Sequence, residues 1–261
     1  MKIIILLFVV TSLLGCTTLP NTKKITTKYG EFSYQLSGNG NPTIILEAGW
    51  GDDMTEWKSS LHRFEQFSQV FTYNRAGFKG SDSQNEQRDA QTIALELREL
   101  LKEANIPPPY ILVGHSFGGL YMRVYANTYP SDVSAVIQID ATHHEFFPDP
   151  AFIKKCTKPE AIDLENPTGI PWLALLVLPN AFIGESKELC KTLDTASNNK
   201  SFPEVPLVVL SAGDANQSQH KDLATLSPIS KHIICNSCGH YVHQDKPELL
   251  TEALEWVFDK I

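Results

Sequence analysis

The feature that most constrains the fold is the hexapeptide G-H-S-F-G-G at residues 114–119. The apolar run Tyr110–Val113 before it predicts a buried strand, and the stretch 120–126 after it is compatible with a helix. A G-x-S-x-G motif between a strand and a helix predicts a sharp turn that exposes its serine, here Ser116.

Ser116 is the candidate nucleophile of this chain. A serine hydroxyl is a weak nucleophile, so it needs an exposed position, a base that takes its proton, and donors that stabilise an oxyanion. Gly114 and Gly118 keep side chains out of the turn, where strand and helix pass closely. The helix that begins at Phe117 directs free N–H groups and its positive end toward the serine. A Gly-rich turn without chemistry is the alternative, and the flanking strand and helix disfavour it.

Short β-rich runs alternate with amphipathic segments along the rest of the chain. This alternation predicts an α/β fold, with a mostly parallel sheet and helices on both of its faces. Asp245 and Glu248 have the spacing of a capping box at the start of the last helix. The expected strands are Glu31–Leu36, Thr43–Glu47, Val70–Tyr73, Tyr110–Val113, Val133–Ile139, Leu207–Leu210 and His232–Cys235. The expected helices are Met54–Phe67, Asp89–Asn105, Phe117–Tyr129, His220–Leu226 and Pro247–Asp259.

One long segment breaks this alternation. No strand fits between Ala141 and Pro206, where Pro-rich turns surround the apolar run Ile170–Leu178. An insertion of this length after a strand favours a helical lid over about residues 141–206, because long connections in compact domains usually carry a function. The alternative is a helical excursion that only covers the edge of the sheet.

The N-terminus has the layout of an export signal. Lys2 is followed by the apolar run Ile3–Leu14, which is too short to span a bilayer as a helix. The following Gly15-Cys16 resembles the end of a bacterial lipobox, in which cleavage before the cysteine leaves Cys16 as a lipidated N-terminus. An ordinary signal peptide with an incidental cysteine is the alternative.

We therefore expect a lipoprotein signal peptide at residues 1–15 and a polar tether at residues 16–28. One α/β domain would follow at residues 29–261. The mature protein would be exported and held at a membrane of a bacterial cell envelope by the lipid on Cys16.

The composition limits the class of protein and the partners that the chain can have. The formal net charge is −8 and the isoelectric point is near 5.5, which argues against a nucleic-acid partner. With 42% hydrophobic and 20% charged residues, the chain is globular rather than disordered. Nothing in the sequence suggests a metal or an organic cofactor, and His143-His144-Glu145 is expected to be a solvated turn rather than a metal cluster.

Four cysteines remain besides Cys16, and in an exported protein they permit two disulfides. We expect Cys156 to pair with Cys190 inside the insertion. Cys235 and Cys238 should pair locally or stay reduced. A thioredoxin-like redox site is disfavoured, because its C-x-x-C motif opens a helix, whereas this one ends a strand.

Four landmarks occur together in the order and spacing of the α/β-hydrolase fold, which the chain resembles over nearly all of its mature length. They are I-L-E-A-G-W-G at 45–51, Y-N-R-A-G-F-K-G-S-D at 73–82, the Ser116 turn, and Gly239-His240. The resemblance implies that His240 is the base, because the histidine comes last in chain order and lies on a loop at the carboxyl edge of the sheet. His243 is the nearest competitor, and it should face the entrance of the following helix.

The resemblance also implies two oxyanion donors. One is the backbone N–H of Phe117, directly after the nucleophile, and the other is the backbone N–H of Trp50. The family usually has a histidine where this chain has Ala48, so the hydrogen bond that fixes this loop must be replaced or absent.

Two aspartates are candidates for the acid that orients His240. Asp214 lies near the family's commonest location, after a strand. Asp140 ends the preceding strand, and the segment 139–143 resembles a subgroup whose acid is supplied there. We prefer Asp140 and keep Asp214 as the alternative.

These residues predict a serine hydrolase, similar to carboxylesterases and lipases, that cleaves small-molecule carboxylic esters through an acyl-enzyme intermediate. Dehalogenases and epoxide hydrolases, which the chain resembles in fold, are disfavoured, because their nucleophile is an aspartate, whereas this chain has Ser116 at that position. The alternative from another class is a catalytically weak ligand-binding or sensor protein with the same fold.

Overall fold

An eight-stranded sheet forms the centre of the computed structural model, which describes residues 19–82, 87–145, 180–198, 202–213 and 217–261. The strand order is β1-β2-β4-β3-β5-β6-β7-β8; the pairs β1–β2 and β2–β4 are antiparallel, and the other neighbouring strands are parallel. The strands are β1 Lys23–Thr27, β2 Gly30–Ser37, β3 Thr43–Glu47, β4 Val70–Tyr73, β5 Tyr110–His115, β6 Val133–Ile139, β7 Leu207–Ala212 and β8 Ser230–Cys235.

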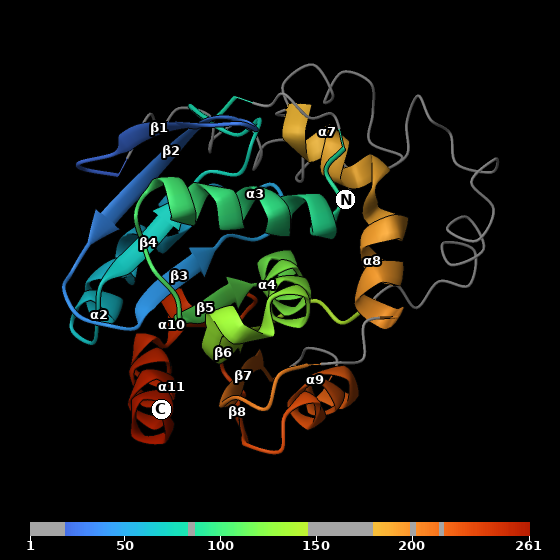
Figure 1. Ribbon diagram of the computed structural model, residues 1–261. Coiled ribbons are helices and arrows are strands. Elements are labelled where there is room, and N and C mark those ends of the chain that lie inside the picture. The colour runs from blue at the N-terminus through green and yellow to red at the C-terminus, as the bar shows by residue number, and fades with distance from the viewer. Residues whose placement is uncertain (1–18, 83–86, 146–179, 199–201, 214–216) are drawn as a thin grey trace, which may run out of the picture.

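Helices cover both faces of this sheet (Figure 1). The apolar sides of α2 and α11 pack on one face, and those of α3, α4 and α9 pack on the other. The described helices are η1 Met54–Ser59, α2 Leu61–Glu65, α3 Ala90–Glu103, α4 Phe117–Thr128, η2 Pro130–Asp132, α7 Asn180–Lys187, α8 Leu189–Asn198, α9 Gln217–Leu223, η4 Ala224–Leu226, α10 Val242–Asp245 and α11 Pro247–Lys260.

The central strands are apolar because both of their faces are covered. Every residue of β3, β4, β5 and β7 is buried, as is typical of parallel strands between two helical layers. The predicted α/β architecture is thus confirmed, and the carboxyl ends of the parallel strands meet at one edge of the sheet, where ligands bind in such folds.

The first strand corrects the expected tether. Lys23–Thr27 pairs along its whole length with β2 in antiparallel register, so ordered structure begins before residue 29. The segment is polar because it forms the edge of the sheet, where charged side chains are common, and its threonines favour extended backbone.

Two helix predictions also need correction. The helix expected over Met54–Phe67 is divided into η1 and α2, and the chain turns at Ser60, whose N–H donates to Trp57 O. The capping box at α11 is wrong, because Asp245 Oδ2 instead accepts from the N–H of Gly239 at 2.8 Å.

Several predictions concern residues outside the described ranges: the signal peptide, Cys16, Cys156, Asp214 and most of the expected lid. Within the insertion the structure describes α7 and α8. Helix α8 packs against α3 and α4 through Leu189, Leu193 and Ala196 (Figure 1). None of the helices in the described ranges is long and apolar enough to cross a membrane.

Candidate active site

Ser116 lies in a sharp turn between β5 and α4. Its backbone has φ 53° and ψ −123°, a conformation that costs a non-glycine residue on the order of 1–3 kcal/mol. A Cβ at Gly118 would lie 2.3 Å from Glu47 O, and a Cβ at Gly114 would lie 2.4 Å from Gly118 O. The close approach therefore requires glycine at both positions, as the sequence predicted.

The turn is fastened to the end of strand β6. The N–H of Ser116 donates to Ile139 O at 3.0 Å, and Ser116 O accepts from the N–H of Thr142 at 2.9 Å. These two bonds flank Asp140, whose backbone has φ 41° and whose N–H donates to Leu210 O at 2.6 Å. The predicted nucleophile and the preferred acid are thus held on neighbouring strand ends.

Asp140 contacts the predicted base directly. His240 Nδ1 donates to Asp140 Oδ2 at 2.6 Å, and the N–H of Ala212 donates to Asp140 Oδ1 at 2.9 Å. Burial raises the pKa of Asp140, but the hydrogen bonds from His240 and Ala212 and the neighbouring His220 outweigh burial and lower it. Asp140 is therefore a carboxylate, which accepts the N–H of His240 Nδ1 and so holds a ring proton on that nitrogen.

The His240 side chain is about half exposed, at 49%, as a group that meets a solute must be. It follows β8 after a turn closed by the disulfide between Cys235 and Cys238. Local pairing of these two cysteines was one of the two expected outcomes. Among the described residues Asp140 is the carboxylate that contacts the His240 ring, and the other candidate acid, Asp214, lies outside these residues.

The segment with the second expected oxyanion donor also lies against the serine. A Cβ at Gly49 would be 3.4 Å from Ser116 Cβ, which places the turn 48–50 beside the serine. Phe117 is the first residue of α4, so its N–H has no acceptor within the helix. The Trp50 ring packs against Phe117 and against Phe182 of α7, with centroids 5.4 and 4.9 Å apart.

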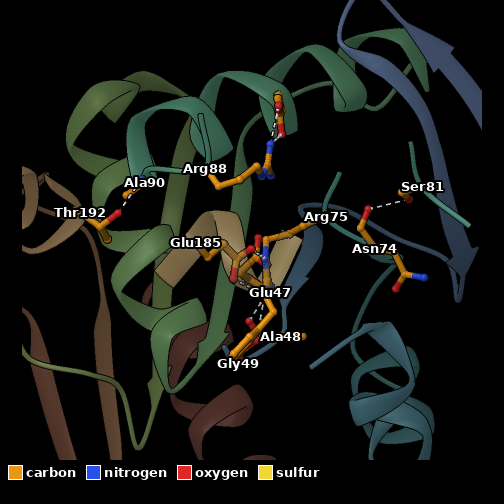
Figure 2. Close-up of polar contacts among 12 residues, drawn as sticks. Glu47, Ala48, Gly49, Asn74, Arg75, Ser81, Arg88, Ala90, Glu185 and Thr192 are labelled. Carbon is orange, nitrogen blue, oxygen red and sulfur yellow. Dashed lines mark hydrogen bonds and ion pairs between the residues drawn. The ribbon is translucent and has the colours of Figure 1, made fainter. Parts of the chain in front are cut away.

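Arg75 fixes this turn, and sequence reasoning missed it. Its guanidinium donates to Ala48 O at 2.9 Å and to Gly49 O at 3.0 Å. It thereby supplies the restraint that the family's histidine would provide at position 48. Figure 2 shows Arg75 between Glu47 of β3 and Glu185 of α7. Arg75 Nη1 lies 2.7 Å from Glu47 Oε1, and Arg75 Nε lies 2.6 Å from Glu185 Oε1.

This cluster of charges is buried. The Arg75 side chain is only 2% exposed. Burial lowers the pKa of Arg75, but Glu185 and Glu47 raise it well above its ordinary value, so the guanidinium stays charged. Burial also raises the pKa of Glu47, against the opposing effects of Arg75 and of the hydrogen bond from Tyr73. A charged residue at the end of an apolar strand, as at Glu47, is the sequence signal that could have found this cluster.

A second buried cluster lies behind the turn. Glu56, His115 and His243 bring possible metal-ligating atoms within 4.8 Å of one another, the one such group among the described residues. His243, expected at a helix entrance, is fully buried, and its ring packs against Trp57 with centroids 4.8 Å apart.

In the turn expected to be solvated, Glu145 is exposed and His144 is partly exposed, but His143 is not. His143 is buried, and its Nε2 lies 3.0 Å from Asp222 Oδ2, because the following turn packs against α9. The N–H of Glu145 donates to His143 Nδ1 at 3.1 Å. His143 is therefore a structural residue that joins the end of β6 to α9.

The strand order of the sheet, the turn at Ser116, and Asp140 and His240 after the ends of their strands together define an α/β-hydrolase fold. Residues 42–164 match the family model described as alpha/beta hydrolase fold. The chain is 27% identical over 226 residues to the uncharacterized protein YqjL of Bacillus subtilis (strain 168), and the match covers 83% of each chain. A shorter match, 26% identical over 121 residues, covers 45% of this chain and 33% of epoxide hydrolase 3 of Xenopus tropicalis.

Among solved structures, a thermophilic esterase from Thermogutta terrifontis superposes with a TM-score of 0.70. The superposition covers 92% of this chain and 98% of the esterase, at 18% sequence identity. Proteins similar to this chain thus bear the names of different hydrolases, and the reaction must be argued from the site itself.

Proposed function

We propose that this protein is a serine hydrolase that cleaves small-molecule carboxylic esters through an acyl-enzyme intermediate. The observation that carries the proposal is the contact between Asp140 and His240 Nδ1. It lies at the carboxyl edge of the sheet, where the turn between β5 and α4 presents Ser116. A carboxylate on Nδ1 holds the imidazole in the tautomer whose Nε2 can accept a proton.

In the proposed reaction Ser116 Oγ attacks the ester carbonyl carbon while His240 takes the hydroxyl proton. The backbone N–H groups of Phe117 and Trp50 stabilise the oxyanion of the tetrahedral intermediate. His240 then protonates the departing alcohol, leaving an acyl group on Ser116. Water, activated by His240, hydrolyses this acyl-enzyme and restores the serine.

The nucleophile distinguishes this reaction from others on the same fold. Epoxide hydrolases and dehalogenases resemble this chain in fold, but they have an aspartate at the position of the nucleophile. The match to an epoxide hydrolase therefore does not extend to its reaction. The aromatic contacts of Trp50 with Phe117 and Phe182 favour an apolar acyl group beside the proposed oxyanion donors.

The decisive experiment is covalent labelling with a fluorophosphonate, followed by turnover of p-nitrophenyl esters of increasing acyl length. We expect the wild-type protein to label and to hydrolyse esters, and Ser116→Ala to do neither while its circular dichroism is unchanged. Folded wild-type protein that never labels would favour the ligand-binding or sensor alternative. Asp140→Asn and Asp214→Asn, compared in the same assay, decide which aspartate is the acid.

We also propose that the protein is an exported lipoprotein anchored through Cys16. The proposal is supported by the order of the first residues: a positive charge at Lys2, a short apolar run, and Gly15-Cys16. A lipid anchor would place the esterase at a membrane surface, where esters with apolar acyl groups concentrate.

A further inference from the structure

Behind the proposed catalytic residues, one buried chain of contacts joins two loops of the site. The N–H of Gly49, beside Trp50, donates to Glu56 Oε2 at 2.9 Å. Glu56 Oε1 lies 2.6 Å from His115 Nδ1. His115 Nε2 lies 3.1 Å from the backbone carbonyl oxygen of His240. This series of contacts therefore joins residues 48–50, which carry the proposed oxyanion donor Trp50 and are called the oxyanion loop, to the loop after β8 that carries His240, called the base loop.

The partners of His115 determine where its protons are. The carbonyl oxygen of His240 can only accept, so Nε2 carries a hydrogen. A carboxylate oxygen 2.6 Å from a bare ring nitrogen would be repelled, so Nδ1 also carries a proton and forms an ion pair with Glu56, without the alignment of a hydrogen bond. The pair holds one proton more than a neutral histidine beside a carboxylate would.

The surroundings of the pair favour the charged form on both residues. Burial lowers the pKa of His115, but the close contact and charge of Glu56, with the His240 carbonyl and Asp52, raise it overall. Burial raises the pKa of Glu56, but His115, His243 and the N–H of Gly49 lower it overall.

Three further rings face the pair. The nearest is that of His240, whose centroid lies 4.5 Å from that of His115. Burial and the neighbouring His115 lower the pKa of His243 to about 4, so His243 is neutral. The Tyr241 ring lies 4.9 Å from the His115 ring. Burial raises the pKa of the Tyr241 hydroxyl, so this group is neutral too. Glu56 is thus the charge in direct contact with the His115 imidazolium among the described residues.

The spacing fits an ion pair and not a shared metal ion. Two ligands about 2.0–2.1 Å from one tetrahedral ion are separated by roughly 3.3 Å. Glu56 Oε1 and His115 Nδ1 are 2.6 Å apart, which is the distance of a direct ion pair and too short for two ligands of one ion.

We propose that His115 and Glu56 form a charged positioning pair, which holds the oxyanion loop through Gly49 and the base loop through the His240 carbonyl. The inference rests on the proposed function, because it assigns a role to both residues in the same reaction. Neither side chain touches the substrate: the pair fixes the distance between the oxyanion donors and the base.

The test uses two variants of the full-length protein. His115→Phe keeps an aromatic ring but removes both nitrogen contacts, and Glu56→Gln keeps the shape and can still accept from Gly49 while donating to a neutral His115. His115→Phe should lower kcat about 10- to 100-fold at unchanged KM, since misplacing reacting groups by about 1 Å costs up to ~10²-fold. Glu56→Gln should stay within about threefold of wild type at neutral pH, because both loops keep their partners.

The pH profile separates positioning by charge from packing. The pKa of folded His115 is raised, so the pair's stabilisation is present at lower pH and is lost as the pH rises through that value. Wild-type kcat should therefore decline as the pH rises through the raised pKa of His115, and this decline should be absent from Glu56→Gln, whose amide satisfies neutral His115. The same decline in Glu56→Gln would overturn the charged pair.

His243→Phe is the matched control, since it changes a buried ring of the same cluster that lies 3.4 Å from Glu56 but contacts neither the N–H of Gly49 nor the His240 carbonyl. A loss of kcat in His243→Phe equal to that in His115→Phe would show a packing effect and overturn the proposal. If His115→Phe does not fold, His115→Phe/Glu56→Gln, which leaves no uncompensated charge, takes its place. Wild-type kcat in that folded variant would also overturn the proposal.

Nitrogen NMR of His115 keeps this inference separate from the proposed function. Both ring nitrogens should be protonated at neutral pH in wild type, and only one in Glu56→Gln, whether or not the protein hydrolyses esters. Failure to label with fluorophosphonate would reject the esterase, whereas a singly protonated wild-type His115 would reject the pair.

Discussion

Replacing Arg75 with methionine should lower the free energy of unfolding by about 3–5 kcal/mol, the cost of breaking a buried ion pair from one side. Methionine retains much of the apolar volume of the arginine stem, so the loss is mainly electrostatic. It leaves the carboxylates of Glu47 and Glu185 buried without a cation, and it frees the carbonyls of Ala48 and Gly49. For a domain of this size the melting temperature should fall by roughly 6–20 °C.

Arg98→Met provides the matched control. Arg98 also donates to a carboxylate, that of Asp132 at 2.9 Å, but its side chain is 51% exposed. An exposed pair of this kind contributes about 0–1 kcal/mol. Guanidinium unfolding followed by tryptophan fluorescence would measure both variants, because Trp57 is fully buried in the core. An unfolding free energy of Arg75→Met equal to that of Arg98→Met would refute the reasoning.

The deficit of Arg75→Met should also depend on pH. Burial already holds the pKa of Glu47 above its ordinary value in the presence of Arg75. Without the cation, the folded state takes up protons more readily than the unfolded state, so lowering the pH restores stability and raising it removes stability. Arg75→Met/Glu47→Gln/Glu185→Gln should recover most of the loss, since no buried charge remains. A deficit of the same size at acidic and alkaline pH would contradict this explanation.

Three further predictions concern other parts of the chain. Asp140→Asn should reduce kcat by about 10⁴, as in trypsin-like triads, and Asp214→Asn should retain most activity; ester assays of folded variants giving the reverse order would transfer the role to Asp214. Gly118→Ala should lose about 1–3 kcal/mol of stability and slow fluorophosphonate labelling, because its Cβ would lie 2.3 Å from Glu47 O; wild-type unfolding and labelling would contradict the close approach. Cys16→Ser should release the protein from membranes or block its maturation, and unchanged membrane fractionation would reject the anchor.

The parts of the fold that the sequence predicted are those encoded locally. Strands β3, β4 and β6 have the predicted bounds, since each is a short apolar run between turn residues. The turn at Ser116 was predicted for the same reason, because its strand, turn and helix are contiguous. Strand β1 was missed, because a polar edge strand has no apolar pattern, and its partner β2 alone determines it.

The polar clusters could not be predicted, because their members are distant in the sequence. Arg75 meets Glu47 across 28 positions and Glu185 across 110. No periodicity or spacing connects such residues. Even so, a charged residue within an apolar strand demands a partner, so the composition of β3 indicates that a buried cation exists without saying which one.

Both clusters meet at Gly49, and this explains how the turn can lack the family's histidine. Glu56 holds the N–H of Gly49 and Arg75 holds its carbonyl, so a buried charge fixes each side of one peptide segment beside Ser116. Arg75 also joins β3 to α7, so changing it should alter stability and the oxyanion loop together. The His115 ring has its polar contacts with Glu56 and the His240 carbonyl, so loop position and global stability should be separable in His115→Phe/Glu56→Gln, which leaves no buried charge without a partner.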